Sequence, residues 1–139
     1  MVAGLRRVLL AAILITASVA AAQGDRDVAD ARAAVLEQLE AFRVGNFDAA
    51  YAFASAEIRQ QFDRRQFEQM VRGGYPEIAR PAGVVVDGAE RAANGHVFVF
   101  LRIRGVNGGA VQAVYEMVHE RGSWKVNGVV TRPDTSERA

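Results

Sequence analysis

The strongest constraint on the fold is a change in hydrophobic period at Gly83. Beyond it the chain contains four strand-like apolar runs, over residues 84–86, 97–103, 111–118 and 124–130. The runs are separated by the dipeptides Asn94-Gly95, Asn107-Gly108 and Arg121-Gly122. Asn-Gly is a strong hairpin signal because both residues accept a positive φ. Three tight turns between four strands predict an antiparallel meander.

Before Gly83 the apolar residues follow a helical period. Residues 25–43 are predicted to form a helix, whose stripe of Val28, Val35, Leu39 and Phe42 is interrupted by Arg32. Asn46 is predicted to cap a short helix over residues 47–53, and Ser55 a further turn through Ile58.

A second helical signature follows. Asp63 and Gln66 have the spacing of a capping box, and Phe62 and Phe67 that of a hydrophobic staple. This helix is predicted to end near Arg72, before Gly73-Gly74. Helices followed by an antiparallel meander indicate an α+β fold.

The N-terminus has the character of a targeting segment. Arg6 and Arg7 precede an uncharged run that ends in three alanines at Ala22, which is typical of a secretory signal peptide over residues 1–22. An uncleaved anchor is the alternative. The expected organisation is one domain over residues 23–132 and a flexible C-terminal tail over 133–139, in a periplasmic or secreted protein with no membrane span after cleavage.

Composition excludes several classes of protein. A formal net charge of +1 over 139 residues gives no support for nucleic-acid binding, which favours a basic excess. The absence of cysteine excludes disulfide scaffolds, thiol catalysis and cysteine–zinc sites. We expect no cofactor and no metal.

The turn positions suggest a strand register. Two-residue turns would place Ala93 opposite His96, Val106 opposite Gly109, and Glu120 opposite Ser123. This register puts Asp87 opposite Arg102, Phe100 opposite Tyr115, Phe98 opposite Met117, His119 opposite Trp124 and Tyr115 opposite Gly128. These pairings define one aromatic-rich face that is expected to meet the helices. The pocket candidates on it are Asp87, Phe98, Phe100, Arg102, Tyr115 and Met117.

Within this pocket Arg102 could attract an anionic group, and Tyr115 could donate a hydrogen bond to it. The alternative is that Asp87 and Arg102 form a cross-strand ion pair. His96 and His119 are predicted to face each other at the rim of the sheet, where one of them could act as a general base. A metal site there would lack further ligands.

The same register leaves an aliphatic outer face. A sheet face turned to water is normally polar, so this face predicts a contact with a partner, most simply a second copy of the chain. The expected interface residues are Val97, Val99, Leu101, Glu116 and Asn127. A half-exposed sheet rich in β-branched residues is the alternative.

The order of these segments resembles the nuclear-transport-factor-2-like superfamily, a cystatin-like α+β cone. The resemblance rests on residues 51–55, 58–62, 70–76, 109–112 and 124–128. Within the superfamily the chain is similar to an uncharacterised family of short exported bacterial proteins. The resemblance implies a pocket between the helices and the concave sheet face, and dimerisation through the other face.

Three functions fit these expectations. The first is an exported, non-catalytic module that binds a small apolar or amphipathic ligand or another exported protein. The second is an acid–base enzyme of the isomerase or dehydratase type, using Asp87, Tyr115 or a histidine. The third is a structural homodimer whose cone is filled by side chains. Fold alone does not choose among them.

Overall fold

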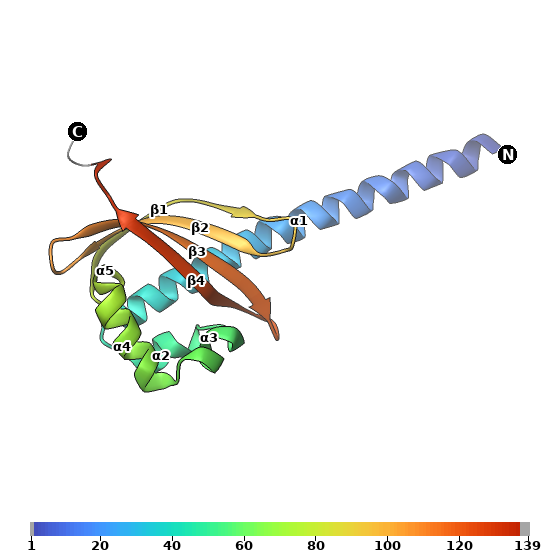
Figure 1. Ribbon diagram of the computed structural model, residues 1–139. Coiled ribbons are helices and arrows are strands. Elements are labelled where there is room, and N and C mark those ends of the chain that lie inside the picture. Colours follow the sequence, from blue (N-terminus) through green and yellow to red (C-terminus); the bar gives the residue numbers. More distant parts are fainter. Residues whose placement is uncertain (1, 137–139) are drawn as a thin grey trace.

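The computed structural model describes the backbone of residues 2–136 and the side chains of residues 18–136. In this part of the chain, helices precede a four-stranded antiparallel sheet, and the helices lie on one face of the curved, open sheet (Figure 1). The helices are α1 (Val2–Arg43), α2 (Phe47–Ala52), α3 (Ala56–Gln61), α4 (Arg64–Gly74) and α5 (Pro76–Ala79). The strands are β1 (Pro81–Arg91), β2 (Val97–Gly105), β3 (Ala110–Glu120) and β4 (Ser123–Pro133), in the order β1-β2-β3-β4. The predicted α+β meander is confirmed.

Side-chain caps begin the short helices. Asn46 and Ser55 accept hydrogen bonds from Ala49 N–H and Ile58 N–H, and thereby start α2 and α3. The capping box of Asp63 and Gln66 is present at the start of α4, as predicted. The additional helix α5 begins at Pro76, where the missing N–H of proline costs no helical hydrogen bond.

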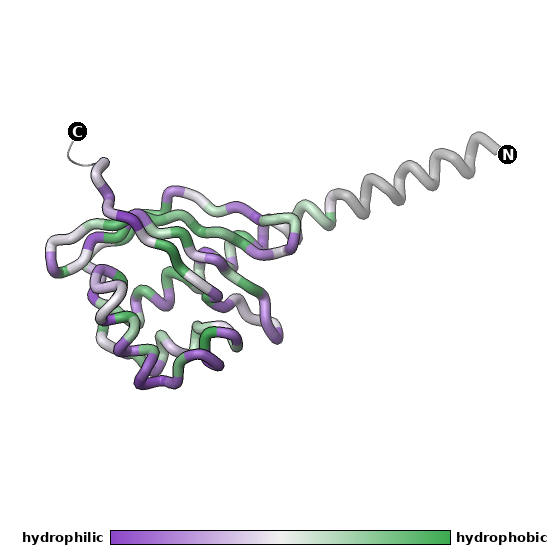
Figure 2. Tube along the Cα trace, in the orientation of Figure 1, coloured by the Kyte–Doolittle hydropathy of each residue, from purple (hydrophilic) through white to green (hydrophobic). Residues whose placement is uncertain are grey.

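The core lies between α1 and the inner face of the sheet. The C-terminal half of α1 contacts all four strands. Its buried stripe contains Val35, Leu39 and Phe42 as predicted, and the fully buried Ala31 fills the gap that the exposed Arg32 leaves in it. Figure 2 shows hydrophobic residues along the central strands and hydrophilic residues at the hairpin ends and outer helical turns.

The two Asn-Gly turns are one residue longer than predicted. Ala92 N–H donates to His96 O, and Gly105 N–H donates to Gly109 O, so each loop contains three residues. The glycine in each loop has a positive φ, +87° at Gly95 and +83° at Gly108. A three-residue loop with its last residue in the left-handed region is a common hairpin alternative to the two-residue turn.

The longer loops reverse the faces of β2, so the predicted pairings across the first two turns are wrong. Tyr115 lies opposite Val99 rather than Phe100, and Met117 lies opposite Val97 rather than Phe98. A shift of one residue moves every side chain to the other face. The inner face of β2 is therefore aliphatic and fully buried, consisting of Val97, Val99, Leu101 and Ile103.

The third turn has the predicted form. Glu120 lies opposite Ser123 and His119 opposite Trp124, around a two-residue turn with positive φ at Arg121 and Gly122. The register then shifts at a bulge in β4, where Glu116 pairs with Gly128 and Met117 with Val126. Asn127 is the extra residue, so Tyr115 lies opposite Val129 rather than Gly128.

The chain ends differ from the expected organisation in one respect. Strand β4 continues to Pro133, and Asp134 N–H donates to Ala110 O, so the sheet extends beyond residue 132. Residues 137–139 of the predicted tail, and the side chains of residues 1–17 of the predicted signal peptide, lie outside the described residues. Within the described residues, no helix combines the length and the apolar character needed to cross a membrane.

The corrected register predicts opposite responses at two valines. Val99→Asp places a carboxylate in the fully buried core and is expected to unfold the domain. Val130→Asp alters an outer-face side chain that is 73% exposed and is expected to change the free energy of unfolding by less than about 0.5 kcal/mol. Urea unfolding followed by circular dichroism measures both, and a stable Val99→Asp protein would contradict the register.

A second pair of variants tests the contact between the β2–β3 hairpin and α5. A Cβ atom at Gly105 would lie 2.9 Å from the Glu77 Cα atom and 2.5 Å from the Asn107 Oδ1 atom, so Gly105→Ala is expected to lower the melting temperature. Gly73→Ala meets nothing within 4 Å and is expected to stabilise α4 by about 0.5–1 kcal/mol. Calorimetry of both variants checks the prediction, and equal melting temperatures would contradict it.

Candidate functional site

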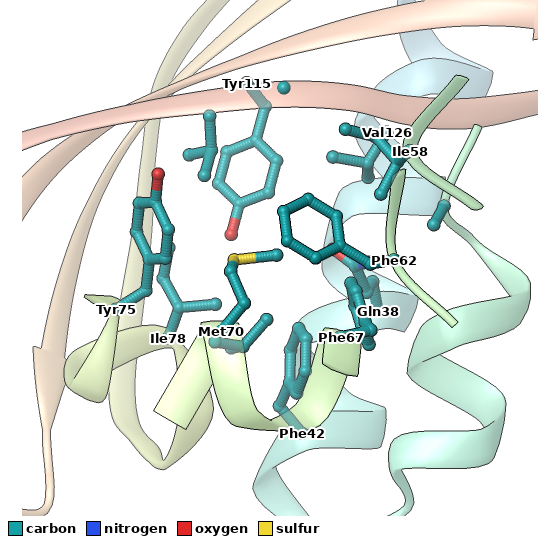
Figure 3. A pocket seen from close by; sticks show the side chains of 14 residues that line it. Gln38, Phe42, Ile58, Phe62, Phe67, Met70, Tyr75, Ile78, Tyr115 and Val126 are labelled. Carbon is teal, nitrogen blue, oxygen red and sulfur yellow. The ribbon is translucent and has the colours of Figure 1, made fainter. Parts of the chain in front are cut away.

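A cavity of about 260 Å³ lies between the helices and the inner face of the sheet (Figure 3). It is lined by Gln38, Phe42, Ala54, Ile58, Phe62, Phe67, Met70, Val71, Tyr75, Ile78, Tyr115, Val126, Gly128 and Val129. Several lining residues are only half-buried, among them Ile58, Phe62, Met70, Tyr75 and Val129, so the cavity is open to solvent. It is larger than an engineered cavity of about 150 Å³ that accommodates benzene in another protein.

Aromatic rings form the wall opposite the sheet. The rings of Phe42 and Phe67 are stacked with their centroids 6.1 Å apart, and Tyr51 lies 5.2 Å from Phe67. The Tyr51 hydroxyl donates to Phe62 O at 2.7 Å. These contacts hold α1, α2 and α4 together and give the cavity a rigid wall.

Tyr115 supplies a buried polar atom in this apolar cavity. Its side chain extends from β3 into the space between Tyr75 and Phe62, with the hydroxyl directed toward Met70 (Figure 3). The residue is 1% exposed, and within the described part of the chain its hydroxyl oxygen has no hydrogen-bond partner. An unpaired buried hydroxyl is costly, so the arrangement favours a partner that the chain itself does not provide.

The other buried polar side chain in the lining already has a partner. Gln38 on α1 is 3% exposed, and its Nε2 atom donates to Ala50 O at 3.1 Å. Among the described lining residues there is no carboxylate, imidazole, ammonium or guanidinium group. Burial raises the pKa of the Tyr115 phenol, so this hydroxyl is neutral and able to donate at physiological pH.

Most of the predicted pocket residues lie outside this cavity. Asp87 and Arg102 form an ion pair on the outer face of the sheet, with Arg102 Nη2 3.0 Å from Asp87 Oδ1. The alternative prediction for these two residues, a cross-strand ion pair, is therefore confirmed. Phe98 and Phe100 also project outward and are half-buried, because the longer loops reversed β2. Met117 is on the inner face and fully buried, but of the six candidates only Tyr115 lines the cavity.

The two histidines are separated by the sheet, so the predicted rim pair is wrong. His96 lies on the outer side of the sheet, as Phe98 does, and its Nδ1 atom is 2.9 Å from Glu116 Oε1. His119 shares the inward side of the sheet with Trp124, and their ring centroids are 5.1 Å apart. Among the described residues no group of three or more side chains could hold a metal ion.

The predicted interface residues divide between the two faces. Val97, Val99 and Leu101 are buried against the helices, so they cannot form an outer surface. Glu116 and Asn127 belong to a polar network in which Asn127 Nδ2 donates to Glu116 Oε1 at 3.3 Å. Within the same network the Ser55 hydroxyl donates to Asn127 Oδ1 at 2.8 Å.

The residues that the pocket prediction missed come mainly from the helices. Phe67, Met70 and Val71 on α4 line the cavity together with Ile78 on α5, and the three- and four-residue spacing of the α4 residues marks one face of that helix. That spacing identifies the face that meets the sheet. It does not tell which of these side chains leave space beneath them.

Together the fold and the cavity define an α+β domain in which helices and one face of an open antiparallel sheet enclose an apolar chamber. The chain belongs to a family described as Domain of unknown function (DUF4864), whose family model matches residues 24–139. Comparison with curated proteins and with solved structures found no match.

The unpaired hydroxyl predicts an unusual response to substitution. Tyr115→Phe removes a buried, unpartnered polar atom but keeps the ring, so its free energy of unfolding at pH 7 is expected to equal or exceed that of the wild type by up to about 1–3 kcal/mol. Urea unfolding measures this difference, and a loss of more than about 1 kcal/mol would reveal a hydrogen bond to Tyr115.

The raised pKa of Tyr115 predicts how the stability of the domain changes at alkaline pH. Unfolded tyrosine ionises near pH 10, whereas the folded phenol keeps its proton, so wild-type stability falls as pH rises above about 10. Tyr115→Phe has no ionisable group at this position, so its free energy of unfolding relative to that of the wild type should increase between pH 10 and 11. Parallel pH profiles of the two proteins would contradict the burial of Tyr115.

Proposed function

We propose that this domain binds a small apolar molecule in the cavity between its helices and its sheet, without catalysing a reaction. The observation that carries the proposal is the apolar cavity of about 260 Å³ with the unpartnered Tyr115 hydroxyl inside it. Binding needs only volume and a polar anchor, and both are present.

The alternative hypotheses have less support. An acid–base enzyme needs a titratable group in the cavity with a partner in reach, and the described lining residues offer only tyrosines. The carboxyl and imidazole candidates, Asp87, His96 and His119, lie outside it. A filled cone would require Phe98 and Phe100 on the inner face, where Val97 and Val99 stand instead.

Membership of the nuclear-transport-factor-2-like superfamily is part of the proposal. Its support is the helical layer over one face of a curved antiparallel meander, with the cavity between the two layers (Figure 1). Export is proposed on the apolar segment before Ala22 and on the start of the family match at residue 24, just beyond that segment.

Native mass spectrometry of the full chain, produced in a bacterial host and never denatured, tests these proposals together. We expect a mass above that of the polypeptide from a retained small molecule, and a chain shortened by residues 1–22. The subunit count tests the predicted homodimer, whose interface would have to use outer-face side chains such as Phe98 and Phe100.

A matched pair of substitutions links binding to the cavity. Val71→Phe adds a ring inside the cavity and is expected to lower the uptake of an environment-sensitive apolar dye by at least tenfold. Val44→Phe makes the same change at a position that is 59% exposed and outside the lining, and should leave uptake unchanged. Equal dye uptake by the two variants, both folded by circular dichroism, would place the dye elsewhere and contradict the proposal.

A further inference from the structure

We propose that the ligand of this cavity is a neutral molecule with one hydrogen-bond acceptor, such as a ketone, and that the Tyr115 hydroxyl donates to that acceptor in preference to binding a carboxylate. This inference rests on the proposed function and names the ligand class for the same site.

The first step is the assignment of Tyr115 as the anchor. Gln38, the other buried polar side chain of the lining, already donates to Ala50 O. The Tyr115 hydroxyl is buried inside the cavity and has no hydrogen-bond partner among the described residues. A ligand oxygen near Met70 would therefore meet a neutral donor that lacks a hydrogen bond (Figure 3).

The second step is the discrimination against charge. A carboxylate entering the cavity would lose its hydration and find no described cationic side chain in the lining. The arginines on α4 near Phe47 are engaged with acidic residues, Arg64 with Asp48 and Glu68, and Arg72 with Glu68. Arg102 lies on the outer face of the sheet, paired with Asp87. A neutral acceptor avoids this desolvation cost and still satisfies Tyr115.

The third step is size. If a cavity of about 150 Å³ holds the six carbons of benzene, one of about 260 Å³ suits about ten non-hydrogen atoms. Three probes of about this size separate the contributions: 2-nonanone has a neutral acceptor, nonanoate a charged one, and butylbenzene none.

Isothermal titration calorimetry at pH 7.5 with the full chain and its Tyr115→Phe variant tests the inference. Wild type is expected to bind 2-nonanone at least tenfold more tightly than nonanoate. Tyr115→Phe should lose about fivefold to tenfold in affinity for 2-nonanone, as expected for one hydrogen bond, and keep its affinity for butylbenzene. Nonanoate bound as tightly as 2-nonanone, or an unchanged affinity of the variant for 2-nonanone, would overturn the inference.

The outcomes distinguish the two proposals. Binding of butylbenzene without any preference for 2-nonanone over nonanoate would leave apolar binding intact and overturn only the ligand class. If none of the three probes binds the wild type, the proposed function fails and the inference fails with it. If Tyr115→Phe does not fold, the wild-type ratio of 2-nonanone to nonanoate affinity alone decides.

Discussion

Two asparagine side chains set the geometry on which the rest of the sheet depends. Asn94 Oδ1 accepts from His96 N–H at 3.0 Å, and Asn107 Oδ1 accepts from Gly109 N–H at 2.9 Å. Each asparagine is followed by a glycine at positive φ, and together they hold three residues in each loop. Because strand side chains alternate between the two faces of a sheet, this single additional residue decides which set of alternate β2 side chains faces the helices.

The cavity is a consequence of that choice. Val99, rather than a phenylalanine, lies opposite Tyr115 on the inner face, and a branched aliphatic side chain takes less space there than a ring. The rings of Phe98 and Phe100 are directed to the outer face instead. Tyr115 is therefore the large side chain that extends from the sheet toward α4, and its hydroxyl is the part nearest to Met70 (Figure 3). The same register thus creates both the space and the unpaired donor.

The β4 edge fixes one end of the cavity. Ser55 N–H donates to Val126 O and Val126 N–H donates to Phe53 O, so the segment before α3 covers the strand edge there. The Ser55 hydroxyl also contacts Asn127, the bulged residue, and the network continues through Glu116 to His96 on the outer face. Past the bulge, Gly128 and Val129 are half-buried. The segment before α3 is thus fixed to β4 beside the cavity.

Local signals were enough to predict every helix and strand except α5, and they failed where two turn geometries fitted the same residues equally well. The capping box at Asp63 and the turn at Arg121-Gly122 each fit one local structure only, and both predictions are confirmed. An Asn-Gly pair fits a loop of two or three residues, and β2 is apolar on both faces from Val97 to Leu101, so the only polar signal for its outer face comes from Arg102 and Arg104 near the end of the strand. The alternation in β3 carried more information, because Ala113, Tyr115 and Met117 alternate with Gln112 and Glu116. A tyrosine in such an inward stripe must take its hydroxyl into the interior, which made it the one cavity residue that sequence could identify. The helical lining could not be found in this way, since the space beneath it exists only once helix and sheet are packed together.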